Sequence, residues 1–455
     1  MPYNALFLKL LHGLVALAGL FFLNPALGRS EVSPELTSAL KRIGPNSAVS
    51  VVDIDSGVSL VDVRGGEPLK PASVLKVLTS IVALEKLGPN FRFETFVSEY
   101  PVKGGYGLLI EGGGAPDFAI EDAWLLARAI RVSGRGAYEE VLLDDGAFLS
   151  TPARQGQRAY QTGPGALSFN YNSVTFKVCP TSAGRPARVM VDPWESGYTV
   201  SGTIQTGAKS TFTIDELRPG SFRARGMIAS TAGCAEVYRS VTDPTAYFGA
   251  VFPQLLRSVG VSGKLLARRG APPQNARPLT VARSKPLSQI VEDLNHFSNN
   301  FIAEQLLYAL GGPRPYDRER GLGVLTDYLL ELGVAASEIR LEDASGLSHE
   351  NRLTARALTR LLRANLESVE VHPEFEVSLS VAGRSGTLRK RDFGVPDGRV
   401  RAKTGTLDGV SSLAGYLTTK RGRRLAFAIL LNSMRDKQAA LRIEDDLVRL
   451  LYQST

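Results

Sequence analysis

Residues 71–88 read PASVLKVLTSIVALEKLG, an apolar stretch that starts with a proline and ends with a glycine. Apolar residues recur at helical spacing over 74–87, and Gly88 supplies a C-terminal stop, so the stretch predicts a helix. Ser73 then lies near the positive end of the helix dipole, and Lys76 lies one turn further along on the same face. The pattern therefore predicts a serine beside a lysine at a helix start.

This serine–lysine pair is suited to nucleophilic catalysis. A serine hydroxyl needs a base that removes its proton. A lysine in a dry site beside another cation can lose its proton near neutrality, because desolvation and like charge both disfavour the ammonium. Taken alone, however, the pattern is better explained as an N-cap serine followed by a surface lysine.

Two motifs later in the chain favour the catalytic interpretation of Ser73 and Lys76 instead. Residues 298–300 read Ser-Asn-Asn and residues 403–405 read Lys-Thr-Gly, so that Lys403 supplies the second cation. Each motif is short enough to recur by chance, and residues 38–41 are a second Ser-x-x-Lys. That copy falls inside a predicted amphipathic helix, where its hydroxyl faces water or bonds a carbonyl one turn back. We therefore assign the chemistry to Ser73.

The two ends of the chain predict one α+β unit. Alternating and β-branched runs predict strands over 49–54, 58–63, 399–407, 411–418 and 424–431. Helices are predicted over 34–43 and after residue 440, where apolar residues line one face. We interpret the last helix as packing on the sheet, because three acidic residues at 444–446 dilute any basic face. The pattern favours a single antiparallel sheet built from both chain ends, with helices packed on it.

Residues 91–281 have a different sequence pattern from the two chain ends. They contain short alternating runs, such as 173–178 and 198–204, and many glycines and prolines. Only one helical stretch is predicted there, near 124–130. We interpret this region as an insertion with its own core.

The N-terminus and the charge indicate an exported protein. Residues 10–23 are nearly all apolar, and a small-x-small pattern ends at Gly28, which predicts a signal peptide over 1–28 cleaved after Gly28. An uncleaved N-terminal anchor is the alternative. The remainder is then expected in the periplasm or another extracytoplasmic space. The net charge of +8 favours anionic partners such as wall polymers or lipid head groups, and no Arg/Lys run is interleaved with aromatics, which argues against nucleic acid.

The cysteines and histidines do not point to a metal or cofactor. Cys179 and Cys234 are the only cysteines, and they either pair in an oxidising compartment or remain two buried thiols. The histidines outside the predicted signal, at 296, 349 and 372, lack metal-ligand spacing. We predict neither a metal nor a cofactor.

With the three motifs, further signatures lie at 143–145, 166–174, 343–348 and 382–388. On these residues the chain resembles the class C low-molecular-mass penicillin-binding proteins, which are D-alanyl-D-alanine carboxypeptidases and endopeptidases with a large insertion. The resemblance implies a β-lactamase/transpeptidase-like catalytic domain over 29–90 and 282–455. Residues 91–281 would be an inserted region of one or two β-rich domains.

The resemblance also implies an acyl-enzyme mechanism. Ser73 would attack the carbonyl of the penultimate D-Ala of a peptidoglycan stem peptide, with Lys76 accepting its proton and Ser298 passing a proton to the leaving D-Ala. The backbone N–H groups of Ser73 and Thr406 would form the oxyanion hole. β-Lactam antibiotics would enter as substrate mimics and leave the serine blocked. Peripheral association with a membrane or with the wall stays open.

The remaining site residues are implied to bind substrate. Asn300 would orient the substrate amide, and Gly405 would let its backbone approach closely. The terminal carboxylate would be held by Lys403, Thr404 and Thr406. Two residues depart from the family pattern: Ala115 and Ala344 stand where Asp and Gly are expected, and we predict no substrate contact in the insertion or near Asp343.

Three other functions stay open on the sequence. A β-lactamase shares the acylation apparatus and differs in how fast water clears the serine. Another serine acyl hydrolase, or a wall-binding protein without activity, is also compatible with parts of the pattern. The balance between carboxypeptidase and endopeptidase activity, the stem-peptide side chain and the oligomeric state are not encoded in these motifs.

Overall fold

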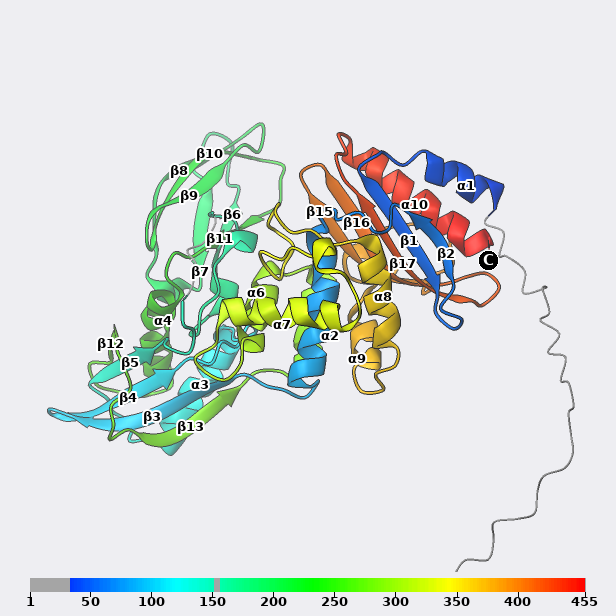
Figure 1. The fold of residues 1–455 in the computed structure, drawn as a ribbon. Helices are drawn as coiled ribbons and strands as arrows, with labels where there is room; N and C mark the ends of the chain where they lie inside the picture. Colours follow the sequence, from blue (N-terminus) through cyan, green and yellow to red (C-terminus); the bar gives the residue numbers. More distant parts are fainter. Residues whose placement is uncertain (1–32, 151–155, 455) are drawn as a thin grey trace, which may run out of the picture.

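The computed structural model describes residues 33–150 and 156–454, so the predicted signal peptide over 1–28 lies outside the described residues. The chain forms two regions: a six-stranded sheet with helices on both faces, and an inserted region of smaller sheets (Figure 1). Within the described ranges, no helix is both long enough and apolar enough to cross a membrane.

The six-stranded sheet joins the two ends of the chain, as predicted. Its strands are β1 (Ser47–Asp53), β2 (Ser59–Val63), β14 (Ser380–Val381), β15 (Val400–Leu407), β16 (Val410–Thr418) and β17 (Arg424–Leu431). Their order is β14-β15-β16-β17-β1-β2, and every neighbouring pair is antiparallel. The chain ends meet where β1 pairs with β17. The predicted α+β class is confirmed.

Helices cover both faces of this sheet. The helices of this region are α1 (Pro34–Lys41), α2 (Lys76–Leu87), α5 (Leu287–Phe297), α6 (Asn300–Leu310), α7 (Arg318–Glu331), α8 (Ala355–Asn365), α9 (His372–Ser378) and α10 (Lys437–Ser454), and α7 packs on α2 and α6. The alternation along β17 sorts side chains to the two faces. Phe427 and Ile429 pack in the core beneath α1 and α10, whereas Ala426 and Ala428 face the core that contains α2 and α8. The last helix thus packs on the sheet, as predicted.

The inserted region contains three sheets. A five-stranded sheet, in the order β12-β5-β4-β3-β13, consists of β3 (Glu94–Val102), β4 (Gly105–Glu111), β5 (Glu140–Asp144), β12 (Leu266–Arg269) and β13 (Arg277–Arg283). One three-stranded sheet contains β6 (Ser173–Cys179), β7 (Arg188–Asp192) and β11 (Ala235–Ser240). The other contains β8 (Thr199–Gly207), β9 (Thr213–Arg218) and β10 (Ser221–Ala229).

The inserted region also corrects one prediction. It has two long helices, α3 (Ile120–Ser133) and α4 (Pro244–Ser258), although only the first was expected. Pro253 lies inside α4, and a proline within a helical pattern normally ends it. Burial of Phe248 and Phe252 in the region's core compensates for the lost hydrogen bond.

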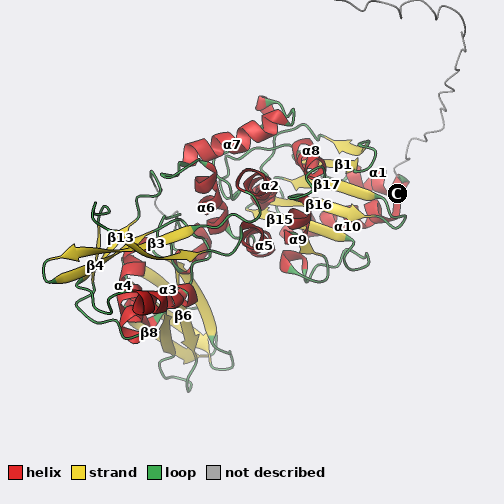
Figure 2. Ribbon diagram, turned by 90° about the horizontal axis from the view of Figure 1, so that it is seen from below, coloured by secondary structure: helices red, strands yellow, loops and turns green. Residues whose placement is uncertain are grey.

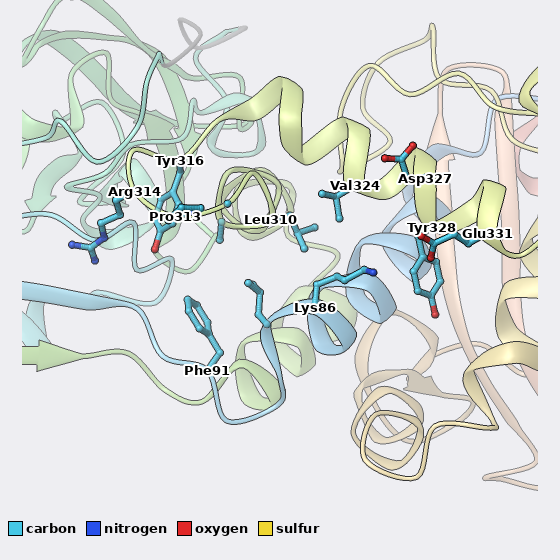
Figure 3. A pocket seen from close by; sticks show the side chains of 13 residues that line it. Lys86, Phe91, Leu310, Pro313, Arg314, Tyr316, Val324, Asp327, Tyr328 and Glu331 are labelled. Atoms are coloured by element: carbon cyan, nitrogen blue, oxygen red, sulfur yellow. The ribbon is translucent and has the colours of Figure 1, made fainter.

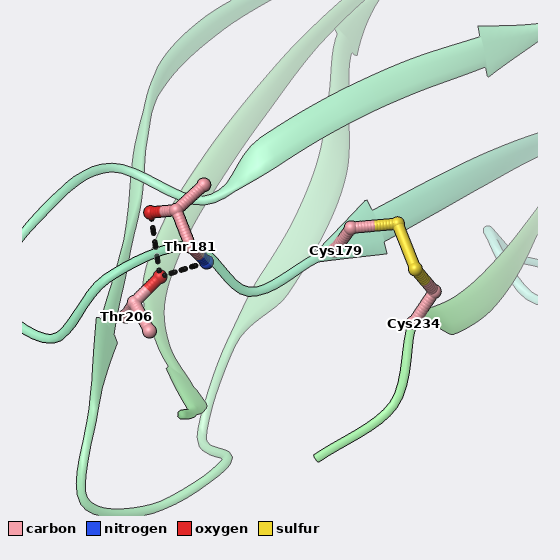
Figure 4. The surroundings of a disulfide bond; sticks show 4 residues. All are labelled: Cys179, Thr181, Thr206 and Cys234. Carbon is pink, nitrogen blue, oxygen red and sulfur yellow. Dashed lines mark hydrogen bonds between the residues drawn. A yellow bond between two sulfur atoms is a disulfide. The ribbon is translucent and has the colours of Figure 1, made fainter. Parts of the chain in front are cut away.

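The two cysteines form a disulfide. Cys179 at the end of β6 is bonded to Cys234, which precedes β11 (Figure 4). Near it, Thr206 Oγ1 accepts a hydrogen bond of 2.9 Å from the Thr181 amide. The alternative of two free thiols is thereby excluded.

Candidate active site

Ser73 lies in a tight 3₁₀ turn, Ala72–Leu75, that leads into α2. Ala72 has a φ of 49°, in the left-handed region that non-glycine residues rarely adopt. Gly346 packs so closely against the carbonyl of Ala72 that a side chain there would clash with it. Ser412 Oγ donates a hydrogen bond of 2.7 Å to the Pro71 carbonyl from β16. The turn is held from two sides, as is typical of strained functional sites.

Lys76 is fully buried and has three hydrogen-bond partners. Its Nζ lies 2.9 Å from Ser73 Oγ, 2.7 Å from Asn300 Oδ1 and 2.5 Å from the Ser345 carbonyl oxygen. Burial lowers the pKa of Lys76 to about 7, and the charges of Asp343 and Glu304 oppose this effect. A large fraction of Lys76 is therefore a neutral amine near pH 7, as a general base requires.

Ser298 and Lys403 form a second serine–lysine pair. Ser298 ends α5 with a φ of 54°, which turns the chain before α6 begins at Asn300. Lys403, fully buried on β15, donates a hydrogen bond of 2.8 Å to Ser298 Oγ. Burial, together with the charge on Lys76, holds the pKa of Lys403 well below its ordinary value. Burial is the largest cause of the lowered pKa of both lysines.

The three residues of β15 that follow Lys403 have different surroundings. Gly405 is buried, and a Cβ atom there would lie 2.8 Å from the Ser73 amide nitrogen. The space beside Gly405 is therefore filled by the nucleophile turn. Thr404 donates a hydrogen bond of 2.9 Å to Thr387 Oγ1, and Thr406 is exposed.

A cavity of about 940 Å³ opens beside these residues. Four of the predicted residues line it: Ser73, Ser298, Asn300 and Thr406. Its wall also includes Tyr160, whose carbonyl accepts a hydrogen bond of 3.2 Å from Asn300 Nδ2, and Leu347 of the loop after Asp343. The inserted region and this loop thus reach the cavity, which we did not expect from the sequence.

A second cavity, about 550 Å³, lies between α2, α6 and α7 (Figure 3). Phe91, Leu310 and Val324 contribute to its lining, which contains no serine, cysteine or histidine. None of the residues of the three motifs is among those that line it. We therefore place the site at Ser73.

Several residues at the centre were missed from the sequence. Ser345 contributes its carbonyl to Lys76, and Glu304 and Asp343 place carboxylates near that lysine. The spacing of Glu304, four residues after Asn300, was a usable signal, because it places both on one helix face. The alternative Ser38 lies exposed on α1, as expected for the copy without a role.

The fold and these contacts define an enzyme class: a transpeptidase-like sheet carrying an active-site serine for acyl transfer, with lysines as its buried basic groups. The chain belongs to the D-Ala-D-Ala carboxypeptidase 3 (S13) family, whose model matches residues 33–454.

Known proteins of similar sequence and fold agree with this assignment. The chain is 33% identical over 436 residues to a D-alanyl-D-alanine carboxypeptidase of Actinomadura sp. (strain R39), covering 88% of this chain and 80% of that protein. Penicillin binding protein 4 of Haemophilus influenzae has the same fold, with a TM-score of 0.81 at 22% identity over 92% of this chain and 99% of that chain. A second structure of that protein, in complex with a β-lactam, gives a TM-score of 0.77.

Proposed function

We propose that this chain is an exported serine D,D-peptidase that hydrolyses the D-Ala-D-Ala bond of peptidoglycan stem peptides. The observation that carries the proposal is the hydrogen-bond arrangement of Lys76. As a neutral amine, Lys76 has two N–H donors, for Asn300 Oδ1 and the Ser345 carbonyl, and one lone pair, which is left for the proton of Ser73 Oγ.

In the proposed acylation step, Ser73 Oγ bonds to the penultimate D-Ala carbonyl carbon while its proton passes to Lys76. The tetrahedral oxyanion is stabilised by the backbone N–H groups of Ser73 and Thr406, a contribution of roughly 3 kcal/mol per donor. The C–N bond then breaks, and the proton taken up by Lys76 reaches the leaving D-Ala nitrogen through Ser298, which gives up its own hydroxyl proton and receives the one from Lys76. Water hydrolyses the resulting ester, which returns Ser73 and releases the shortened peptide.

The substrate groups are assigned to the remaining residues of the site. Asn300 orients the substrate amide, and Lys403, Thr404 and Thr406 bind the terminal carboxylate. Gly405 keeps β15 against the nucleophile turn. The same acyl transfer cuts D,D cross-links when the leaving group is a neighbouring stem peptide, so the proposed activity includes endopeptidase action.

We also propose the domain and cellular organisation that the sequence suggested. Residues 29–90 and 282–455 form the catalytic domain, and 91–281 are the inserted region. Residues 1–28 direct export to the periplasm or another extracytoplasmic space, where peptidoglycan is found, and a basic surface favours association with anionic wall or membrane components.

Intact-protein mass spectrometry after incubation with benzylpenicillin tests the proposal. The wild type and Ser38→Ala should gain one persistent adduct, and Ser73→Ala should gain none. Rapid repeated turnover of penicillin by the wild type would identify a β-lactamase instead. An absence of both adduct and turnover would overturn the proposal and favour an unrelated hydrolase or a wall-binding protein.

A further inference from the structure

One face of α6 carries two side chains that reach the surroundings of Lys76. Asn300 accepts a hydrogen bond from Lys76, and Glu304 follows one helical turn later. Glu304 Oε1 accepts hydrogen bonds from the backbone N–H groups of Ala344, at 3.2 Å, and Ser345, at 3.1 Å. Because the carbonyl of Ser345 accepts from Lys76, Glu304 and Lys76 hold the same residue from opposite sides.

Asp343 fixes the rest of this loop. Its Oδ1 accepts from the Gly346 amide at 2.6 Å, and its Oδ2 accepts from the Ser348 amide at 2.6 Å. Thr79 Oγ1, on α2 one turn after Lys76, donates a hydrogen bond of 2.7 Å to the Ala344 carbonyl. The loop is thereby fastened to the helix that carries the lysine, and the Ser345 carbonyl is aimed at Nζ.

We propose that Glu304 is a positioning residue for the catalytic base: it holds the Ser345 carbonyl on Lys76, so that the amine's lone pair faces Ser73 Oγ, and when ionised it places a negative charge near that amine. The inference rests on the proposed role of Lys76 as the base. It assigns a function to the loop 343–348, which reaches Lys76 through the backbone carbonyl of Ser345.

The electrostatic part of this proposal has a defined sign. The negative charges of Glu304 and Asp343 raise the pKa of Lys76 against the lowering effect of burial. Burial, followed by the charge of Asp343, raises the pKa of Glu304 to about 7. Glu304 also lines a cavity of about 480 Å³. The charged and titratable groups around Glu304 and Lys76 include Asp343, Arg318, Lys403 and Tyr308, with Asp317, Glu319, Glu342 and Tyr160 also lining the cavity.

Two substitutions separate position from charge. Glu304→Gln keeps an oxygen acceptor for the two amides and removes the charge, so acylation should persist while the pH midpoint of its rising limb moves down by about one unit. Glu304→Ala also removes the acceptor, which releases Ser345 and should slow acylation by about tenfold or more across the pH range. Glu319→Gln, on the exposed rim of the same cavity, is the matched control and should leave the midpoint unchanged.

The measurement is the second-order rate constant of acylation by benzylpenicillin from about pH 5.5 to 9, with circular dichroism confirming that each variant is folded. An unmoved midpoint in Glu304→Gln, together with a wild-type rate in Glu304→Ala, would overturn this inference while the proposed function stands. A wild type that is not acylated, or that shows no rising limb, would instead contradict Lys76 as the base, and the inference would fall with it.

Discussion

Lys76 has three hydrogen-bond partners, and of these only Ser73 has a proton to give. The amide oxygen of Asn300 and the carbonyl of Ser345 can only accept, so they occupy the two N–H groups of a neutral amine. This arrangement explains how a lysine can act as a base for serine without a histidine. The same residue, if charged, would have all three protons satisfied and no lone pair.

The first residue-scale prediction concerns pH. Because burial lowers the pKa of Lys76 to about 7, the free base is scarce below that pH and predominant above it. D-Ala release from a stem-peptide analogue, measured as kcat/KM, should therefore rise through about pH 7 and level off above about pH 8. Lys76→Met, of similar length but without a base, should lose about 10²- to 10⁴-fold in rate and should lose this limb. A flat wild-type profile would contradict the assignment.

Gly405 carries the second residue-scale prediction. A Cβ atom at this position would clash with Ser412 Oγ and would lie 2.8 and 3.0 Å from the Ser73 and Val74 amide nitrogens, so Gly405→Ala must displace β15 or the nucleophile turn. We expect the rate of benzylpenicillin acylation to fall roughly 10²-fold, because small displacements of reacting groups are costly.

Gly323→Ala is the control for this substitution. Gly323 lies on α7 with no atom within 4 Å of the added Cβ position, so the alanine variant should acylate at the wild-type rate. Equal rates in both alanine variants would show that β15 tolerates the displacement.

At the scale of elements, the disulfide closes a long loop between β6 and β11. It spans 55 residues of sequence, and closing a loop of this length stabilises a protein by about 4 kcal/mol in the chain-entropy model. The Cys179→Ala/Cys234→Ala double variant should therefore unfold its inserted region at a lower denaturant concentration. Both tryptophans, Trp124 and Trp194, lie in that region, so their fluorescence reports its unfolding directly.

The rate of acylation by benzylpenicillin should not follow this loss of stability. It should stay within about twofold of the wild type in the folded double variant, because the disulfide acts mainly by reducing the entropy of the unfolded chain, and its loss leaves the geometry of the site unchanged. An unchanged denaturation midpoint would mean that the strand pairing of β6 with β11 suffices without the bond.

At the scale of the whole molecule, Gln305 joins the catalytic and inserted regions. This fully buried side chain of α6 donates to the carbonyls of Gly114, at 2.8 Å, and Gly165, at 3.0 Å, and accepts from the Gly165 amide at 3.0 Å. It neighbours Glu304 on the helix that begins with Asn300. Figure 2 shows α2, α5 and α6 between the six-stranded sheet and the inserted region.

Replacing Gln305 with an apolar residue should uncouple the unfolding of the catalytic region from that of the inserted region. Gln305→Leu deprives three backbone groups, one buried and two partly buried, of their partner, at a cost of about 2 to 3 kcal/mol. We expect tryptophan fluorescence and far-ultraviolet circular dichroism to report one common denaturation midpoint in the wild type and two separate midpoints in the variant. Gln289→Leu, on the exposed face of α5, should behave as the wild type. Coincident midpoints in both variants would contradict the coupling.

Local sequence patterns were enough to predict much of the secondary structure of the main sheet and the candidate site residues. The period-two runs at both chain ends predicted five strands of the main sheet, and the Ser33 cap with Pro34 predicted the first helix, because these signals depend only on neighbouring residues. The order of the three motifs pointed to Ser73, Lys76, Ser298 and Lys403. The sequence did not predict helix α4, because its internal proline is tolerated only through burial of the residues around it.

What only the tertiary structure decided is which groups surround Lys76. The Ser345 carbonyl and the Glu304 carboxylate come from segments more than 220 residues away, and a backbone carbonyl has no sequence signature. The same holds for the lowered pKa of Lys76, since its main cause is burial by several elements at once. The sequence by itself thus determined the main sheet and predicted the reacting residues. Their charge states and their alignment depend on long-range packing, which no local pattern encodes.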